Sequence, residues 1–205
     1  MFYWFVYHFV ARIVLLPFLK LFNRMEISGT EHIPRTGPAI IIGNHISLWD
    51  AVILFCIVDR KIWFIGKEEL FRVPLLGPIL RLVGVFPVKR DRIDREALRK
   101  SAEVLEQGDI LSIYPEGTRS TSGELLPFKN GAALFAHRSG AAVIPVYSEN
   151  TNRIFPKSLG RRVRITVGSA LDLSEYYGKK ANQSLLEEMS GRYREAILDL
   201  AGREP

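Results

Sequence analysis

Short apolar runs bounded by proline or glycine limit what this chain of 205 residues can fold into. Residues 38–43, PAIIIG, are typical of a buried strand, and similar runs follow at 110–114 and 142–147. We predict further strands at 61–65, 84–88 and 163–167. Helical patterns lie between the strands, at 47–58, 78–82, 93–106, 131–138 and 184–200. Because strands that alternate with helices usually pair in parallel, we expect one α/β domain whose mainly parallel or mixed central sheet is flanked by helices.

The composition is that of an ordinary globular protein. Hydrophobic residues make up 47% of the chain and charged residues 24%, which excludes a disordered or collagen-like chain. The single cysteine, Cys56, excludes an internal disulfide and fits a reducing compartment. The 28 basic and 22 acidic residues give a net charge of +6. This charge favours an anionic partner, a class that includes membrane lipid, phosphorylated substrates, acidic proteins and nucleic acid.

The first 22 residues are rich in apolar and aromatic side chains, with five aromatic residues among the first seven. A signal peptide is not expected, because no basic stretch precedes the apolar one and no small-residue cleavage site follows it. A membrane-spanning helix is disfavoured, since Arg12 lies near the centre of the segment and Pro17 follows it. An arginine at the bilayer centre costs roughly 2.5–3.5 kcal/mol on insertion scales.

An interfacial position suits this segment better. On a helical wheel, four polar residues fall within one arc of about 120°: His8, Arg12, Lys20 and Asn23. We therefore predict that residues 1–25 form an aromatic-rich helical segment, kinked at Pro17, that lies in the membrane interface, and that residues 26–205 form the α/β domain. The alternative is a terminal helix packed on its own domain or on a partner subunit.

The first candidate site is residues 43–50, GNHISLWD, directly after a predicted strand. Ligands of open α/β sheets usually bind beyond the carboxyl ends of the strands. His45 and Asp50 would not share a helix face, so they meet only if His45 lies in the turn before the helix. Ser47 and Asp50 support that placement, because their spacing resembles a capping box with Ser47 as N-cap. Asp50 would then fix the imidazole tautomer and leave the other nitrogen to take a proton, or else it only caps the helix.

Two further blocks follow predicted strands. Residues 112–120, SIYPEGTRS, contain a tight turn around Gly117 whose amides, with Thr118 and Arg119, suit a phosphate or a carboxylate. Residues 86–92, FPVKRDR, form a basic cluster. Each block alone is also consistent with a solvated loop. In a parallel sheet all three blocks would converge on one edge, where a histidine base beside two basic loops suits proton abstraction from a substrate that carries phosphate.

Other chemistries lack their sequence motifs. The chain has no G-x-S-x-G elbow, no P-loop lysine motif and no G-x-G-x-x-G. Cys56 lies in the apolar run AVILFCIV and is expected to be buried rather than nucleophilic. The four histidines, at positions 8, 32, 45 and 137, do not have the spacing of zinc ligands, so we expect no metal.

Four blocks in order, NHISLWD, GVFPVKRD, YPEGTRS and VIPVY, resemble the glycerolipid acyltransferase family, in particular the bacterial 1-acyl-sn-glycerol-3-phosphate acyltransferases of the PlsC type. The first block matches that family's N-H-x-x-x-x-D motif, and FKNGAALFA, between the third and fourth blocks, is also similar to the family. The resemblance covers residues 26–170, which makes 26–205 the expected acyltransferase domain. One departure is Tyr114, where the family commonly has Phe.

The resemblance implies a direct transfer with no acyl-enzyme, which agrees with the missing serine or cysteine nucleophile. His45, oriented by Asp50, would deprotonate the sn-2 hydroxyl of lysophosphatidic acid, which attacks the acyl thioester and forms phosphatidic acid. The residues that would bind the glycerol phosphate are Lys89, Arg90, Glu116, Gly117, Thr118 and Arg119. Pro145 is linked to the acyl-donor side or to local site structure, and turn geometry suggests the Gly117 amide as an oxyanion donor.

The implied partners are lysophosphatidic acid, an acyl donor carried by coenzyme A or acyl carrier protein, and an anionic membrane surface, with no cofactor and no nucleic acid. We expect a peripheral or monotopic protein on the cytoplasmic face of the cell membrane. The apolar stretches 51–58 and 73–85 suit either an acyl tunnel or the core. The alternative functions are an acyltransferase for another lysophospholipid or for glycerol 3-phosphate, and a non-catalytic membrane-binding relative.

Overall fold

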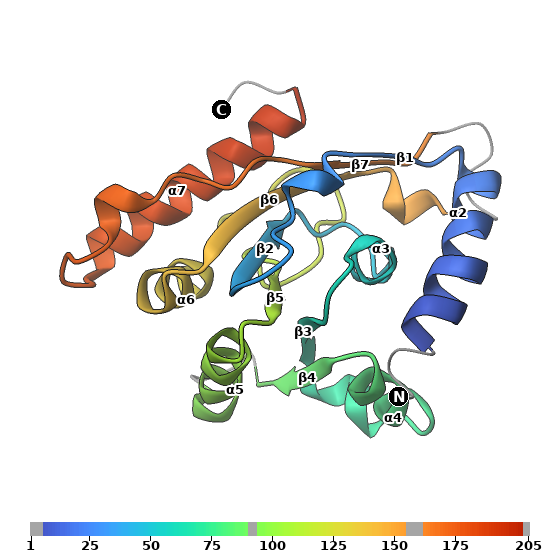
Figure 1. The fold of residues 1–205 in the computed structure, drawn as a ribbon, viewed down its shortest axis with the longest axis horizontal. Helices are drawn as coiled ribbons and strands as arrows, with labels where there is room; N and C mark the ends of the chain where they lie inside the picture. The colour runs from blue at the N-terminus through green and yellow to red at the C-terminus, as the bar shows by residue number, and fades with distance from the viewer. Residues whose placement is uncertain (1–5, 90–93, 155–161, 203–205) are drawn as a thin grey trace.

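The computed structural model describes residues 6–89, 94–154 and 162–202, with side chains from residue 9 onward. The described residues form a seven-stranded sheet in the order β1-β7-β6-β2-β5-β3-β4, with helices on both faces (Figure 1). The strands are β1 (Glu26–Ser28), β2 (Ala39–Gly43), β3 (Ile62–Lys67), β4 (Val85–Val88), β5 (Ile110–Ile113), β6 (Ala142–Glu149) and β7 (Arg164–Val167). Strands β6 and β7 pair antiparallel and the other neighbours pair in parallel, which confirms the predicted mixed α/β sheet.

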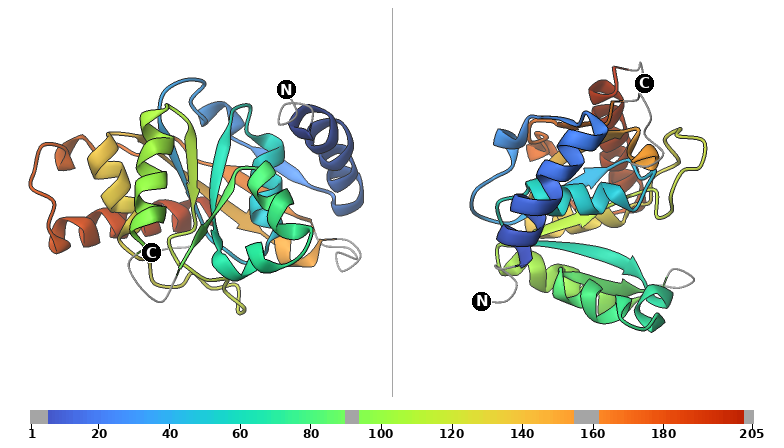
Figure 2. Two further views of the ribbon diagram at one scale, coloured as in Figure 1. Left: turned by 90° about the horizontal axis from the view of Figure 1, so that it is seen from below. Right: turned by 90° about the vertical axis from the view of Figure 1, so that its right-hand side faces the viewer.

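Helices cover both faces of the sheet. The longer helices are α2 (Leu16–Asn23), α3 (Trp49–Ile57), α4 (Leu76–Leu82), α5 (Arg95–Glu106), α6 (Gly131–Ser139) and α7 (Gln183–Leu200). The other helical segments are the π-helix η1 (Val6–Leu15) and the short 3-10 turns η2 (Thr30–His32), η3 (Glu68–Arg72), η4 (Thr151–Arg153) and η5 (Ser174–Tyr176). Helices α2, α3 and α4 lie on one side of the sheet, and α5, α6 and α7 on the other (Figures 1 and 2).

The apolar run of β2 explains its central position. Its five residues are all buried, because β5 and β6 flank it and helices cover both of its faces. Ile41 packs into the core on the α3 side, whereas Ile40 and Ile42 pack into the core under α5, α6 and α7. A strand buried on both faces needs a continuous apolar sequence rather than an alternating one. The stretch 51–58, most of it in α3, also belongs to the core.

The structure adds one strand to the predicted elements and shifts the ends of several others by one or two residues. The three-residue strand β1 was not predicted, because it has a single apolar residue and forms by pairing with β7, far away in the sequence. Helix α5 begins at Arg95 after the N-cap Asp94, whose carboxylate accepts hydrogen bonds from Glu96 N and Ala97 N, both at 3.1 Å. The predicted start of this helix at residue 93 lies outside the described residues.

The N-terminal segment packs on its own domain. Ala11 and Leu19 are buried in the core that includes α3, and Arg12 forms an ion pair with Asp59, just beyond the end of α3. The winding changes from π-helix to α-helix at Leu16, and Pro17 follows in the first turn of α2.

The outer face of the same segment is apolar. The large hydrophobic side chains exposed on it are Phe9, Val10, Ile13, Val14, Phe18, Leu21 and Phe22. The predicted polar arc is only partly exposed: Lys20 is exposed and Arg12 is half-buried, whereas Asn23 is buried and donates to Leu19 O at 2.9 Å. No helix in the described part of the chain is both long enough and apolar enough to cross a bilayer.

Candidate active site

Asn44 fixes the chain where it leaves the sheet. Its side-chain amide donates to Ser148 O at 2.9 Å, and its Oδ1 accepts Ser148 N at 2.7 Å. This buried pair of hydrogen bonds continues the pairing of β2 with β6 beyond the end of β2. The following residue, His45, therefore begins from a fixed position at the edge of the sheet.

His45 and Asp50 form a buried pair in the turn between β2 and α3. The distance from His45 Nδ1 to Asp50 Oδ2 is 2.9 Å, and the two residues are 9% and 1% exposed. Asp50 Oδ2 also accepts the amides of Ile46 (2.9 Å) and Ser47 (2.8 Å), and Thr151 Oγ1 donates to Asp50 Oδ1. Both carboxylate oxygens are thus held by hydrogen bonds. Because Nδ1 faces the carboxylate, Nε2 is the imidazole nitrogen able to take a proton.

The capping box is only partly present. Helix α3 begins at Trp49 with Leu48 as N-cap, and the Ser47 hydroxyl accepts Trp49 N at 3.2 Å. The prediction that Ser47 is the N-cap was therefore wrong. The acidic half of the motif does occur, because Asp50 accepts the amide of Ser47. This backward hydrogen bond places the carboxylate beside His45.

Tyr114 stacks on the imidazole. The ring centroids of His45 and Tyr114 are 4.1 Å apart and the rings are inclined by 16°. The Tyr114 hydroxyl is buried and has no hydrogen-bond partner within the described ranges. Burial, and then the nearby Asp50 carboxylate, raise the pKa of Tyr114 well above its usual value, so the hydroxyl stays protonated at neutral pH.

Glu116 ties the second sequence block to the first. It is buried, its Oε1 accepts His45 N at 2.7 Å, and its Oε2 accepts Leu126 N at 3.0 Å. Ser120 N also donates to His45 O at 2.7 Å. Burial raises the pKa of Glu116, although the two amide donors oppose this effect. The loops after β2 and β5 are therefore hydrogen-bonded directly to each other around His45.

A cleft of about 260 Å³ opens beside the pair. Its polar and turn lining comes from His45, Tyr114, Gly117, Lys89 and Lys129. Apolar side chains supply much of the rest, namely Ile65, Val88, Ile113, Ala132 and Phe135. The three sequence blocks therefore converge on one edge of the sheet, as their positions after parallel strands predicted. A histidine, two lysines and an apolar wall can hold an anionic group and an acyl chain together.

Comparison with known proteins identifies the family. The sequence profile of the acyltransferase family matches residues 24–149, more than half of the chain. The chain belongs to this family.

Two curated relatives are both described as 1-acyl-sn-glycerol-3-phosphate acyltransferases. The chloroplast 1-acyl-sn-glycerol-3-phosphate acyltransferase of Arabidopsis thaliana is 33% identical over 153 residues, which cover 73% of this chain and 43% of that protein. The 1-acyl-sn-glycerol-3-phosphate acyltransferase of Borreliella burgdorferi is 33% identical over 162 residues, covering 75% and 65%. The chain thus spans less than two thirds of the length of either relative.

A solved structure shares the fold of this acyltransferase. The crystal structure of the 1-acyl-sn-glycerophosphate acyltransferase PlsC from Thermotoga maritima superimposes with a TM-score of 0.65 and 22% identity, covering 98% of this chain and 95% of that one. The agreement over nearly the full length confirms the predicted α/β architecture.

The residues predicted to bind substrate do not all lie in the cleft of this acyltransferase. Lys89 and Gly117 line it, and the Glu116 carboxylate holds the loops beneath it. Thr118 and Arg119 are exposed on the turn and are not among the lining residues. Arg90 lies outside the described residues.

The Gly117 amide is already used by the turn. It donates to Tyr114 O at 3.0 Å, so it is not available to an oxyanion as suggested from the sequence. Gly117 has a φ of +70°, and a Cβ at this position would lie 3.0 Å from Lys129 Nζ. The positive φ favours glycine at this position, whereas the flexible end of the Lys129 side chain could move to make room for a Cβ.

Lys129 and Thr151 are site residues that the sequence analysis missed. Lys129 is held by its amide, which donates to Pro115 O at 2.8 Å, and its side chain reaches the cleft over Gly117. The FKNG stretch that contains Lys129 was a signal, since it was already similar to the family. Thr151 had no local signal, because it meets Asp50 across 101 residues of sequence.

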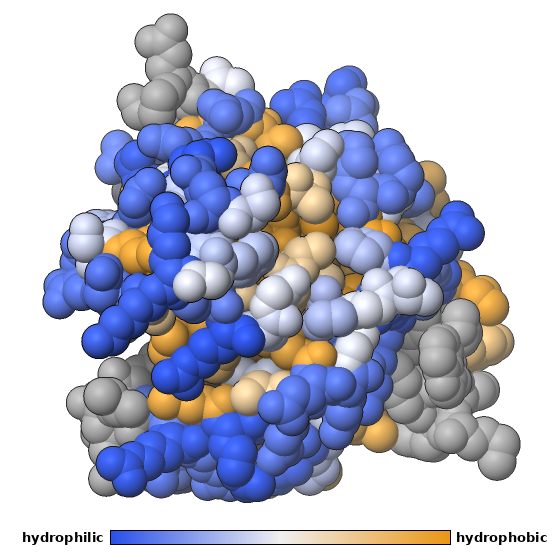
Figure 3. Space-filling model, turned by 60° about the vertical axis from the view of Figure 1, so that its left-hand side comes forward, coloured by the Kyte–Doolittle hydropathy of each residue, from blue (hydrophilic) through white to orange (hydrophobic). Residues whose placement is uncertain are grey.

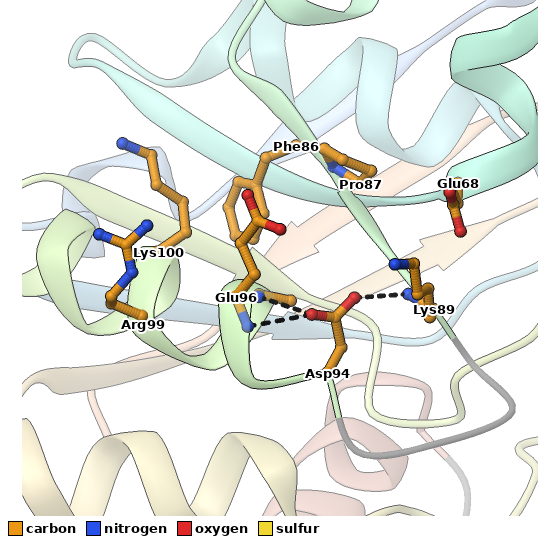
Figure 4. Close-up of a pocket in the computed structure, with 9 residues that line it drawn as sticks. Glu68, Phe86, Pro87, Lys89, Asp94, Glu96, Arg99 and Lys100 are labelled. Carbon is orange, nitrogen blue, oxygen red and sulfur yellow. Dashed lines mark hydrogen bonds between the residues drawn. The ribbon is translucent and has the colours of Figure 1, made fainter.

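Asp94 fixes the end of β4 beside the cleft. Its carboxylate accepts Lys89 N at 2.9 Å in addition to the two helix amides, and a second cavity of about 230 Å³ lies next to it (Figure 4). The amides of Lys89 and Ala97 hold the pKa of Asp94 below its usual value. Lys89 lines both cavities. Across the described ranges, no three His, Cys, Asp or Glu side chains are grouped so that they could hold a metal ion.

Proposed function

We propose that this protein transfers an acyl group from a thioester to the sn-2 hydroxyl of 1-acyl-glycerol 3-phosphate, forming phosphatidic acid. The observation that carries the proposal is the buried His45–Asp50 pair at a cleft that also holds Lys89 and Lys129. The 1-acyl-sn-glycerol-3-phosphate acyltransferases of Arabidopsis thaliana and Borreliella burgdorferi support the choice of acceptor. A lysophosphatidate needs both features, because it presents a hydroxyl to be deprotonated and a phosphate to be bound.

In the proposed mechanism His45 is the general base. Its Nε2 takes the proton of the acceptor hydroxyl, and the oxygen attacks the carbonyl carbon of the thioester. The C–S bond then breaks, and the leaving thiolate receives the proton from the imidazolium. Asp50 stabilises the imidazolium at Nδ1, and the stacked ring of Tyr114 does so from its face. A positioned base of this kind contributes about 10²–10⁴-fold to the rate.

The two lysines account for recognition of the acceptor. Lys89 and Lys129 come from loops after β4 and before α6, and both line the cleft that contains His45. Their ammonium groups suit the phosphate of the acceptor, and the exposed Arg119 can approach the same anion from the turn. Glu116 acts by holding the loops rather than by binding substrate. Arg90 stays a sequence-based prediction for phosphate binding.

The acceptor is a membrane lipid, so the protein is expected to work at a bilayer. The apolar outer face of η1 and α2 supports peripheral binding, and we place it on the cytoplasmic face of the cell membrane. Peripheral binding would let the lipid acceptor reach His45 without leaving the membrane completely. The acyl donor is a thioester of coenzyme A or of acyl carrier protein, and no cofactor or metal takes part.

Transfer of a radiolabelled acyl group by the purified full-length protein tests the proposal. Lysophosphatidate in mixed micelles is offered with acyl-coenzyme A or acyl carrier protein as donor, beside glycerol 3-phosphate and lysophosphatidylcholine as other acceptors. We expect phosphatidate from lysophosphatidate, and a loss of about 10²–10⁴-fold in kcat for His45→Ala. Transfer to another acceptor alone would replace the substrate and keep the base. No acyl transfer with any of the acceptors and either donor would refute catalysis.

A further inference from the structure

Among the described residues, the exposed large hydrophobic side chains gather on one side of the molecule. The large hydrophobic side chains exposed in the described residues belong to the N-terminal helical segment, to Leu48, and to the segment around η3 and α4. On the opposite side, over α5, α6 and α7, the surface is mostly hydrophilic and hydrophobic residues lie in the hollows (Figure 3). A two-sided distribution of this kind marks an interaction surface rather than the scattered exposure that is normal for soluble proteins.

The segment between η3 and α4 presents three of these side chains, which we name the α4 tip. Val73 is 47% exposed, Leu75 80% and Ile79 53%. These residues belong to the stretch 73–85 that the sequence analysis assigned to an acyl tunnel or to the core, so neither assignment holds for them. Because η3 starts where β3 ends, the α4 tip emerges at the same edge of the sheet as the cleft.

Leu75 is held in a strained conformation that points it outward. Its φ and ψ are +67° and −38°, and Leu76 N donates to Pro74 O at 2.8 Å. These features describe a classic γ-turn, which is rare because a side chain at positive φ is strained. A leucine kept exposed at such a position has no packing role that would offset the strain.

Close packing of α4 on η3 keeps the tip rigid. Gly77 is buried, and a Cβ at this position would lie 2.4 Å from Phe71 O. The Arg81 guanidinium lies over the Phe71 ring, 5.4 Å from its centroid. The tip is therefore preorganised, and presenting its apolar side chains to a partner costs little further ordering.

We propose that the α4 tip inserts into the lipid bilayer as a second membrane contact, separate from the N-terminal segment. The charge around the tip supports lipid as the partner: Arg72, which pairs with Glu68 at 3.2 Å, and Arg81 flank it, and residues 72–82 contain no acidic residue. Two arginines around an apolar tip match anionic headgroups above an acyl layer. The position also supports lipid, because α4 lies on the same side of the sheet as η1 and α2 (Figure 2), which carry the other exposed hydrophobic residues.

The second contact fixes how the cleft is presented to the membrane. A single helix lying in the interface leaves the protein able to roll about the helix axis, whereas two separated contacts do not. The exposed Leu48, three residues after His45, then also faces the lipid. This consequence for substrate delivery rests on the proposed function, but membrane insertion of the tip does not.

Insertion is measured with an environment-sensitive fluorophore on the full-length protein. Cys56 is fully buried, so a labelled cysteine introduced by Leu75→Cys reports on the tip, and Ser184→Cys on the exposed start of α7 is the matched control. Vesicles of phosphatidylcholine and phosphatidylglycerol are added. We expect a blue shift, and quenching by a lipid-embedded quencher, at position 75 only. A probe at position 75 that stays aqueous on vesicle-bound protein would overturn the proposal.

The variant Leu75→Gly separates folding from binding. Glycine adopts positive φ without strain, so this variant should melt at the wild-type temperature or above it. We expect its vesicle partition coefficient to fall roughly ten-fold, as loss of a buried leucine side chain implies. A vesicle partition coefficient equal to that of the wild type would contradict insertion. A second contradicting result would be that the wild type is a dimer which Leu75→Gly converts to a monomer while vesicle binding stays the same.

Acyl transfer in detergent micelles keeps the two proposals apart. A wild-type protein that inserts position 75 but makes no product refutes the proposed function alone. A protein that makes phosphatidate while position 75 stays aqueous refutes the second membrane contact alone.

Discussion

Removal of the Tyr114 hydroxyl should stabilise this protein without slowing it. The hydroxyl is buried and lacks a hydrogen-bond partner among the described residues, and so does the hydroxyl of Ser112, two residues earlier on β5. An unsatisfied buried hydroxyl lowers the free energy of unfolding by about 1–3 kcal/mol. Removing it recovers this energy, but the small void that it leaves offsets part of the recovery. We therefore expect Tyr114→Phe to raise the free energy of unfolding by about 1 kcal/mol. For a chain of this length that raises Tm by about 2–4 °C.

The same variant should keep its turnover, because phenylalanine preserves the ring stacked on His45. Tyr114→Leu removes the stack, and we expect it to lower both kcat and stability. Urea denaturation gives the free energy of unfolding, and acyl transfer to lysophosphatidate gives kcat.

Two other tyrosines provide matched controls. The Tyr193 hydroxyl is also buried and lacks a partner among the described residues, so Tyr193→Phe should stabilise similarly but leave catalysis alone. Tyr176 donates to Glu188 at 3.1 Å, and Tyr176→Phe should cost about 1 kcal/mol. A loss of stability in Tyr114→Phe would refute the reasoning, because it would mean that the hydroxyl is hydrogen-bonded, with Ser112 as the nearest candidate.

Three further changes test other parts of the site. Thr151→Val deletes the donor to Asp50 Oδ1 and should lower the free energy of unfolding, measured by urea denaturation, by about 1.5–3 kcal/mol. Thr151→Ser should restore most of this loss. Equal stability of Thr151→Val and the wild type would mean that the hydrogen bond is not made. Lys129→Ala should raise KM for lysophosphatidate roughly ten-fold or more at unchanged Tm, whereas Lys129→Arg keeps the charge; an unchanged KM would remove Lys129 from phosphate binding. Burial raises the pKa of Cys56 to about 12, so thiol reagents at pH 8 should modify it only in denaturant. Since the folded pKa lies above the unfolded value of about 8.5, wild-type stability should fall relative to Cys56→Ala as the pH rises above about 9, and parallel curves would contradict the burial argument.

The parts of this fold that could be predicted are those determined by local sequence. The continuous apolar run Ile40–Ile42, bounded by Pro38 and Gly43 in the sequence, indicated a strand buried on both faces. For His45 and Asp50, helix geometry and spacing left two possibilities open, contact between the two side chains or a simple helix cap, and the N-H-x-x-x-x-D motif favoured contact.

The parts that could not be predicted depend on contacts distant in sequence. Strand β1 exists because β7 pairs with it, and Thr151 matters because η4 brings it to Asp50. The apolar stretch around Leu75 was assigned to a tunnel or to the core, since hydrophobicity alone does not distinguish a side chain that faces the core from one that faces lipid. Only the three-dimensional arrangement decides between these.

The site also shows why a sequence motif suggests more substrate-binding residues than actually line the cleft. In the NHISLWD and YPEGTRS blocks, the polar side-chain atoms of Asn44, Asp50 and Glu116 are engaged by the backbone groups, the hydroxyl and the imidazole that build the loops. What remains for a substrate in the cleft is the Nε2 of His45 and the ammonium groups of Lys89 and Lys129, with the Arg119 guanidinium exposed on the turn. The charged and polar residues that define the motif therefore serve mainly to hold one imidazole rigidly at the edge of the sheet. A rigid base needs no reorganisation during the reaction, which is where such a scaffold contributes to the rate.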